Sequence, residues 1–76
     1  MEVVTTQHNP SPNNWARADV WVGEKHIGLY EGIVDFYEVH AWAEHRAGNY
    51  TDLVAQDVMS VLDPDGKAQA AIDARY

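Results

Sequence analysis

Residues 16–30, ARADVWVGEKHIGLY, are the stretch that decides the fold. Residues 16–22 alternate between small apolar side chains and polar or aromatic ones, which is the period of a strand with one buried face. Residues 23–25 (GEK) suit a tight turn, because glycine adopts positive φ at little steric cost. Residues 26–30 then return as the antiparallel partner. The pattern predicts a β-hairpin.

The residues before the hairpin predict a further strand. Residues 2–7 (EVVTTQ) are rich in β-branched side chains, which favour strands. Residues 8–14 (HNPSPNN) hold two prolines and several turn-forming residues, and we expect a loop there. Gly28, inside the return strand, predicts a bulge or the close packing of another element over it. The first 31 residues therefore predict an antiparallel sheet of two or three strands.

The segment that follows the hairpin has two interpretations. As a helix it begins with Asp35 as N-cap and Glu38 as the third helical residue, a variant of the capping box. It would end with a left-handed Gly48 after His45 and Arg46 in the last turn. The side chains at helical spacing on its apolar face are Phe36, Val39, His40, Ala43 and Ala47. Alternatively, the aromatic and β-branched residues of 33–45 form a third long strand.

Residues 51–62 predict a second amphipathic helix. Its apolar stripe consists of Val54, Val58, Val61 and Leu62, with Ala55 at the margin. Residues 63–66 (DPDG) again leave two interpretations. Asp63 caps a third helix with Pro64 at its first position, or the four residues turn a hairpin. The alanine-rich segment that follows favours the helix.

These elements place the chain in the α+β class, with two or three short helices packed on one face of a small N-terminal sheet. We expect a single compact domain over residues 1–76. Residues 1–31 would form the β-hairpin region and residues 32–76 an acidic, mainly helical region.

Composition narrows the function classes. The chain has 76 residues, no cysteine and a formal charge of −7. Without cysteine it lacks a disulfide framework and a zinc–thiolate site, which fits a reducing cytosol. The first ten residues do not resemble a signal peptide, and no apolar run approaches the ~20 residues of a membrane span. We therefore expect a soluble, cytoplasmic protein.

The negative charge is concentrated between Glu31 and Asp65. This segment holds eight carboxylates against one cation, Arg46, and the residues outside it cancel. The ends of the predicted helices account for Asp35, Glu38, Asp52 and Asp63. No such structural role is evident for Glu31, Glu44, Asp57 and Asp65.

No motif of catalysis or cofactor binding is present in the sequence. His40 and His45 are five residues apart, so their rings would point in different directions on a helix, and a metal site is not expected. His40 is better explained as a hydrogen-bonded core histidine. We expect neither an enzyme nor a bound cofactor.

The aromatic residues suggest contact with a partner. On the helical interpretation Trp42 lies opposite Phe36 and among charged residues, as an exposed interface residue would. Trp21, on the polar face of its strand, is a similar candidate. Alternatively, Trp42 covers the core from the side, or Arg46 stacks on its ring.

An acidic surface favours a partner with a basic surface or groove, and argues against direct binding to nucleic acid or to an anionic membrane. Carboxylates on a rigid scaffold can imitate a phosphate backbone, and small acidic phage proteins such as anti-CRISPR and anti-restriction inhibitors work this way as a class. This chain is similar to them in size and charge pattern. We expect a non-enzymatic inhibitor or adaptor. The alternative is a module that forms a homodimer through exposed aromatics and a sheet edge.

The residues that we expect to contact the partner are Glu31, Glu38, Trp42, Glu44, Asp57 and Asp65.

Overall fold

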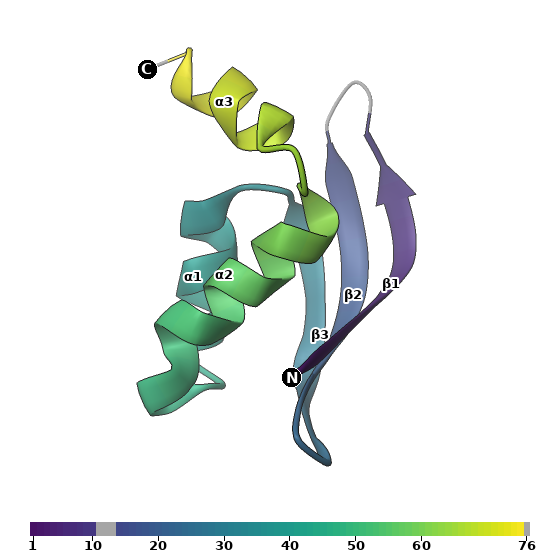
Figure 1. Cartoon of the computed structure of the whole chain (residues 1–76), viewed down its shortest axis with the longest axis vertical. Coiled ribbons are helices and arrows are strands. Elements are labelled where there is room, and N and C mark those ends of the chain that lie inside the picture. Colours follow the sequence, from purple (N-terminus) through teal and green to yellow (C-terminus); the bar gives the residue numbers. More distant parts are fainter. Residues whose placement is uncertain (11–13, 76) are drawn as a thin grey trace.

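The computed structural model describes residues 1–10 and 14–75, and it confirms the α+β class. Three strands form one antiparallel sheet in the order β1-β2-β3, and the helices follow (Figure 1). The strands are β1 (Glu2–Asn9), β2 (Trp15–Val22) and β3 (Lys25–Ile33). The helices are α1 (Phe36–Glu44), a 3₁₀ turn (Gly48–Tyr50), α2 (Thr51–Leu62) and α3 (Lys67–Asp73).

The predicted hairpin is confirmed as β2 and β3, and β2 is the central strand. Its apolar residues Ala16, Ala18 and Val20 are fully buried, while the residues between them are partly exposed. Alternation along β2 therefore decides which face of the sheet receives the helices. β1 runs on to Asn9, so the predicted loop begins later than expected, and its residues 11–13 lie outside the described part of the chain.

Gly28 meets both expectations for its position. The pairing of β2 with β3 shifts register between Val20 and Trp21, opposite Gly28 and His26. Gly28 has a φ of +152°, and a Cβ placed there would lie 2.8 Å from Arg46 Cδ and 3.1 Å from Trp42 Cζ2. Only glycine lets α1 lie this close to β3 without a rearrangement of these side chains.

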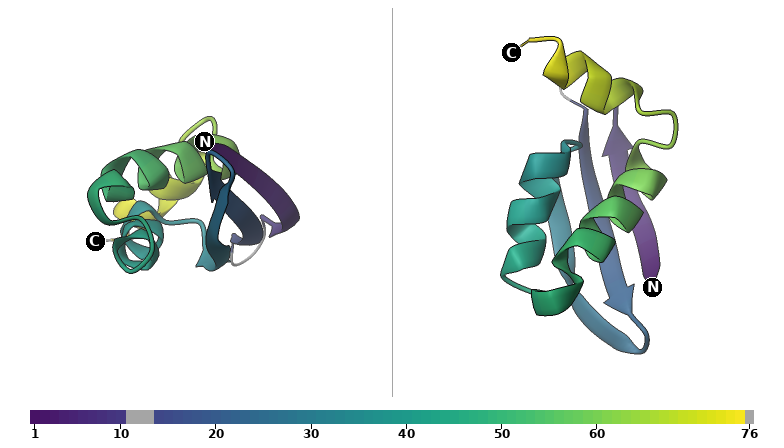
Figure 2. Two further views of the ribbon diagram at one scale, coloured as in Figure 1. Left: turned by 90° about the horizontal axis from the view of Figure 1, so that it is seen from below. Right: turned by 60° about the vertical axis from the view of Figure 1, so that its left-hand side comes forward.

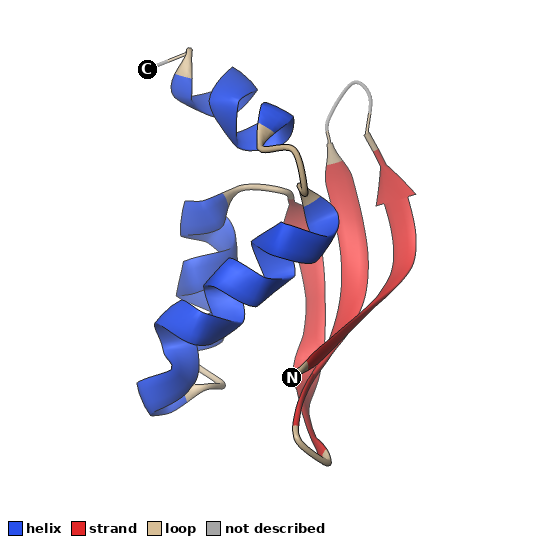
Figure 3. Ribbon diagram, in the orientation of Figure 1, coloured by secondary structure: helices blue, strands red, loops and turns tan. Residues whose placement is uncertain are grey.

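The helices and the sheet form separate layers (Figure 3). α1 and α2 lie side by side over one face of the sheet, and no described element covers the opposite face (Figures 1 and 2). α3 lies beyond the end of the sheet where β2 begins (Figure 1). Residues 33–45 thus form the end of β3 followed by α1, rather than a third long strand, and residues 63–66 lead into a helix rather than a hairpin.

The start of α1 differs from the predicted capping box. Asp35 is the N-cap residue, but its side chain makes no capping hydrogen bond. Gln69 of α3 takes that role: its Oε1 accepts from the Phe36 backbone N–H at 2.6 Å, and its Nε2 donates to Asp35 Oδ1 at 3.0 Å. The donor left free at the helix start is therefore satisfied by a side chain 33 residues away in sequence.

The C-terminal end of α1 also differs. The helix ends at Glu44, so His45 and Arg46 lie beyond its last turn. Gly48 has the predicted positive φ, +54°, but it begins the 3₁₀ turn.

α2 has the predicted bounds, and its buried stripe includes Val54, Val58 and Leu62 as predicted, with Ala55 in place of Val61. Ala55 is fully buried, whereas Val61 is 46% exposed. α2 packs against both α1 and β1, and the small Ala55 allows the close approach that a larger side chain would prevent.

Within residues 1–10 and 14–75, no helix is long and apolar enough to cross a membrane.

Asp63 caps α3, but not in the predicted geometry. Gly66 is the N-cap and Lys67 the first helical residue, so Pro64 lies outside the helix. The two carboxylate oxygens of Asp63 accept from the backbone N–H groups of Ala68 and Gln69, each at 3.0 Å. Asp63 thereby satisfies two donors at the start of α3 while it ends α2.

Candidate functional site

The structure does not bring the six predicted contact residues together. Glu31 lies on β3, on the sheet face that no described helix covers, and Trp42 lies between α1 and β3. Glu44 is at the end of α1 and Asp57 is on α2. Glu38 and Asp65 are the two that share a surface. A single binding face made of all six is therefore excluded by their positions.

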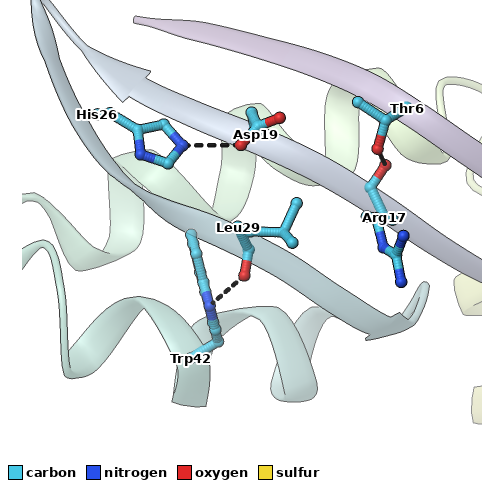
Figure 4. A network of polar contacts seen from close by, with 6 residues as sticks. All are labelled: Thr6, Arg17, Asp19, His26, Leu29 and Trp42. Carbon is cyan, nitrogen blue, oxygen red and sulfur yellow. Dashed lines mark hydrogen bonds and ion pairs between the residues drawn. The ribbon is translucent and has the colours of Figure 1, made fainter.

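The prediction that Trp42 is exposed was wrong, and both alternatives for it hold. Its indole N–H donates to the Leu29 carbonyl oxygen at 3.1 Å, which joins α1 to β3 (Figure 4). Its ring meets Tyr30 edge-on, with centroids 5.6 Å apart, and packs against the core. The Arg46 guanidinium lies 5.0 Å above the indole ring. Trp42 therefore stabilises the contact between helix and sheet.

Three carboxylates that lacked an evident structural role have partners. The Arg17 Nε donates to Glu31 at 2.7 Å across β2 and β3. Glu44 lies 2.9 Å from His40 Nδ1, and Asp65 Oδ1 accepts from the Lys67 backbone N–H at 3.1 Å. The expectation that these three carboxylates have no structural role was wrong. It considered only the ends of the predicted helices, and none of the three contacts caps a helix by its N-cap side chain.

His40 joins the two helices that cover the sheet. Its Nδ1 faces Glu44 on α1, and its Nε2 lies 2.7 Å from Asp52 Oδ1 on α2. The hydrogen bond to Asp52 raises the pKa of His40 above its usual range, the charges of Asp52 and Glu44 add to the effect, and partial burial opposes it. His40 is half-buried and hydrogen-bonded, but the expectation of a core histidine was wrong, because no polar or charged residue is fully buried in the described part of the chain.

A hollow of about 700 Å³ lies between α3, the start of α1 and the ends of β1 and β3. Its lining carries four carboxylates, and we call it the acidic hollow. These carboxylates belong to Asp35, Glu38, Asp63 and Asp65. Two cationic side chains, Lys67 and Arg75, also line it, and Ile33, Ala68 and Ile72 give it apolar wall.

The carboxylates of the acidic hollow fall into two pairs. Asp35 and Asp63 are half-buried and engaged with Gln69 or with backbone N–H groups. Glu38 and Asp65 are exposed, and Glu38 has no hydrogen-bonded or ionic partner among the described residues. Glu38 and Asp65 are therefore the carboxylates that an incoming cation would meet first.

Tyr30 is influenced by two carboxylates of the hollow. Burial raises the pKa of Tyr30, and the charges of Glu38 and Asp35 raise it further, so the phenol stays a neutral donor to the Ile33 carbonyl.

The charge excess belongs mainly to the helical part. Residues 34–76 carry eight carboxylates and three cationic side chains, a formal charge of −5, whereas residues 1–33 carry four and two, a charge of −2. The four carboxylates of the hollow exceed its two cations by two.

The uncovered side of the sheet forms a second surface, which we call the open face. Along β2 its residues are Trp15, Arg17, Asp19 and Trp21, which alternate with the buried ones. Neighbouring strands add three apolar side chains that are about two-fifths exposed, namely Val4 (43%), Leu29 (41%) and Ile33 (43%). Only Trp21 and Glu31 of this face were predicted to contact a partner. The alternation of residues 16–22 was the signal for the whole face.

Side chains on the open face are paired across strands. Arg17 bonds Glu31, and His26 Nε2 lies 2.8 Å from Asp19 Oδ1 (Figure 4). The Arg17 guanidinium lies 5.6 Å from the Trp15 ring centroid, and the Trp21 and His26 rings are 4.8 Å apart. This face therefore presents aromatic surface around charges that already have partners.

Within the part of the chain that the structure describes, no group of three or more His, Cys, Asp or Glu residues is placed to hold a metal ion. No protein-family model matches the sequence, and no curated protein and no solved structure matches it either.

Proposed function

We propose that this chain is a non-enzymatic cytoplasmic inhibitor or adaptor that binds a basic protein surface through the acidic hollow. The observation that carries the proposal is the meeting of four carboxylates at one open hollow of about 700 Å³. A lysine or arginine side chain inserted there would gain charge-assisted hydrogen bonds, and its methylene stem would lie on the apolar wall of Ile33 and Ile72.

The preferred partner is a protein whose basic groove binds nucleic acid. Such a groove presents arginines and lysines at the spacing of phosphates, and an acidic domain of this size would occupy it and exclude the nucleic acid. The charge of −5 on the helical part supports long-range attraction to that groove. The same charge opposes direct binding to DNA, RNA or an anionic membrane.

The experiment measures binding of fluorescein-labelled octa-arginine by anisotropy. The variant Glu38→Gln/Asp65→Asn removes the two accessible negative charges of the hollow, and the asparagine keeps the oxygen that accepts from the Lys67 backbone N–H. The control Glu24→Gln/Asp57→Asn removes two charges outside the hollow. We expect the hollow variant to bind about five- to tenfold more weakly and the control to change less than about twofold.

Two further measurements complete the test. Affinity for octa-arginine should fall steeply between about 50 and 300 mM salt, and labelled duplex DNA should not bind. Equal losses in the hollow variant and in the control would show that net charge alone attracts the peptide, and would reject the hollow as the site. Binding that survives high salt unchanged would reject the electrostatic proposal.

A further inference from the structure

The central strand carries a pattern that is complementary to its own reverse. The open-face residues of β2 read, in order, aromatic, cation, anion, aromatic: Trp15, Arg17, Asp19 and Trp21. If a second β2 lies over the first in the opposite direction, each cation faces an anion and each tryptophan faces a tryptophan. A twofold axis perpendicular to the strands produces this arrangement, and an isologous dimer requires such a self-complementary patch.

From this pattern we propose that the open face is a homodimer interface in which two sheets pack face to face with antiparallel central strands. Arg17 of each copy then lies between its own Glu31 and Asp19 of the second copy. A guanidinium has five N–H donors, so it can bind both carboxylates. This inference does not depend on the carboxylates of the acidic hollow, although Ile33 lies at the edge of both surfaces.

The charges favour a second copy over a basic partner on this face. Arg17 and His26 already lie against Glu31 and Asp19, so little unpaired negative charge remains to attract cations. α1 and α2 lie on the other side of the sheet (Figure 2), and the helical part of the chain carries most of the charge excess. A helix layer lies about 10 Å from its sheet, so in a dimer the two acidic layers are separated by well over the Debye length of about 8 Å. Their mutual repulsion is then largely screened.

The size of the open face sets the expected affinity of the dimer. Three strands of eight or nine residues present several hundred Å² per copy, so a face-to-face pair buries roughly 1,000 Å² in total, near the lower limit for a specific interface. We therefore expect a dissociation constant in the micromolar range, on the order of 10 µM. Two copies also shield Val4, Leu29 and Ile33, which the monomer leaves exposed.

The experiment is sedimentation equilibrium of the full chain between about 1 and 200 µM, with charge-swap variants. Arg17→Asp sets two carboxylates against each other across the interface, and Asp19→Arg sets two cations against each other. Each variant alone should dimerise at least about tenfold more weakly. An equimolar mixture of the two variants should form a heterodimer of near wild-type strength, because every swapped charge then meets its opposite. The matched controls Lys25→Asp and Glu24→Arg make the same changes of charge at exposed positions in and next to the β2–β3 turn and should dimerise as the wild type does.

The mixture separates the proposal from a folding defect, since a variant that failed to fold would not be restored by its partner. Circular dichroism of each variant checks the fold independently. The proposal is overturned by a wild-type chain that stays monomeric at about 200 µM, or by swaps that leave dimerisation unchanged, as pairing through a sheet edge would predict. It is also overturned if both variants are folded and the mixture stays monomeric. Dimerisation should change less than about threefold between about 50 and 300 mM salt, unlike octa-arginine binding.

Discussion

The sheet and the helical part of this molecule use their polar side chains in different ways. In the sheet, Arg17–Glu31 and His26–Asp19 join strands that the backbone ladder already holds together. In the helical part, Gln69 and His40 join helices that have no backbone hydrogen bonds between them. The same kind of contact is therefore redundant in one region and structural in the other.

The largest effect of a substitution on the free energy of unfolding is expected where the sheet meets the helices. Val20→Asp would place a carboxylate at a fully buried position between β2 and the helices, and we expect it to cost about 4 kcal/mol or more, close to the whole stability of a domain of this size. Val4→Asp makes the same change on the open face, where Val4 is 43% exposed, and should cost less than about 1 kcal/mol. Urea unfolding followed by circular dichroism measures both. Similar losses in the two variants would contradict the division into covered and open faces.

A medium effect is expected at Gln69, which joins α3 to the start of α1. Gln69→Ala leaves the Phe36 N–H without its acceptor and frees Asp35, so the free energy of unfolding should fall by about 1 to 2 kcal/mol. Glu31→Gln breaks the exposed ion pair with Arg17 in the sheet and should cost less than about 0.5 kcal/mol. Urea unfolding at low protein concentration, where the chain is monomeric, compares the two. Equal costs would show that helices and strands depend on polar contacts to the same degree.

The smallest effect is expected at His40 and depends on pH. Its pKa is raised in the folded state, mainly by the hydrogen bond to Asp52, so the stabilisation is complete below the unfolded value of about 6.5 and disappears as the pH rises through the folded value. Wild-type stability should therefore decline over that interval relative to His40→Gln. Asp52→Asn removes the main cause and should bring the His40 titration, followed by NMR, closer to its ordinary range. A titration that Asp52→Asn leaves unchanged would assign the shift to another group.

Local pattern predicted α2 better than it predicted α1. The bounds of α2, Thr51–Leu62, were confirmed because its apolar residues repeat at helical spacing against a single continuous core. The ends of α1 were not, because Gln69 supplies the cap and the helix stops at Glu44. Trp42 shows the same limit. Helical periodicity places it on one side of α1, but it does not show that this side faces the Leu29 carbonyl of β3.

The sequence by itself determined the fold class, the hairpin and the charge excess, since these follow from periodicity and composition within short windows. Only the tertiary structure decided which carboxylates remain accessible. Glu31 pairs with Arg17 on the neighbouring strand, Glu44 pairs with His40, and Asp65 accepts from the backbone N–H of Lys67. Glu38 has no partner among the described residues and lines the acidic hollow. The physical reason is that a charge is neutralised or left available by its neighbours in space. The strand register brings Arg17 to Glu31 from 14 residues away, and the packing of α1 on α2 brings His40 against Asp52.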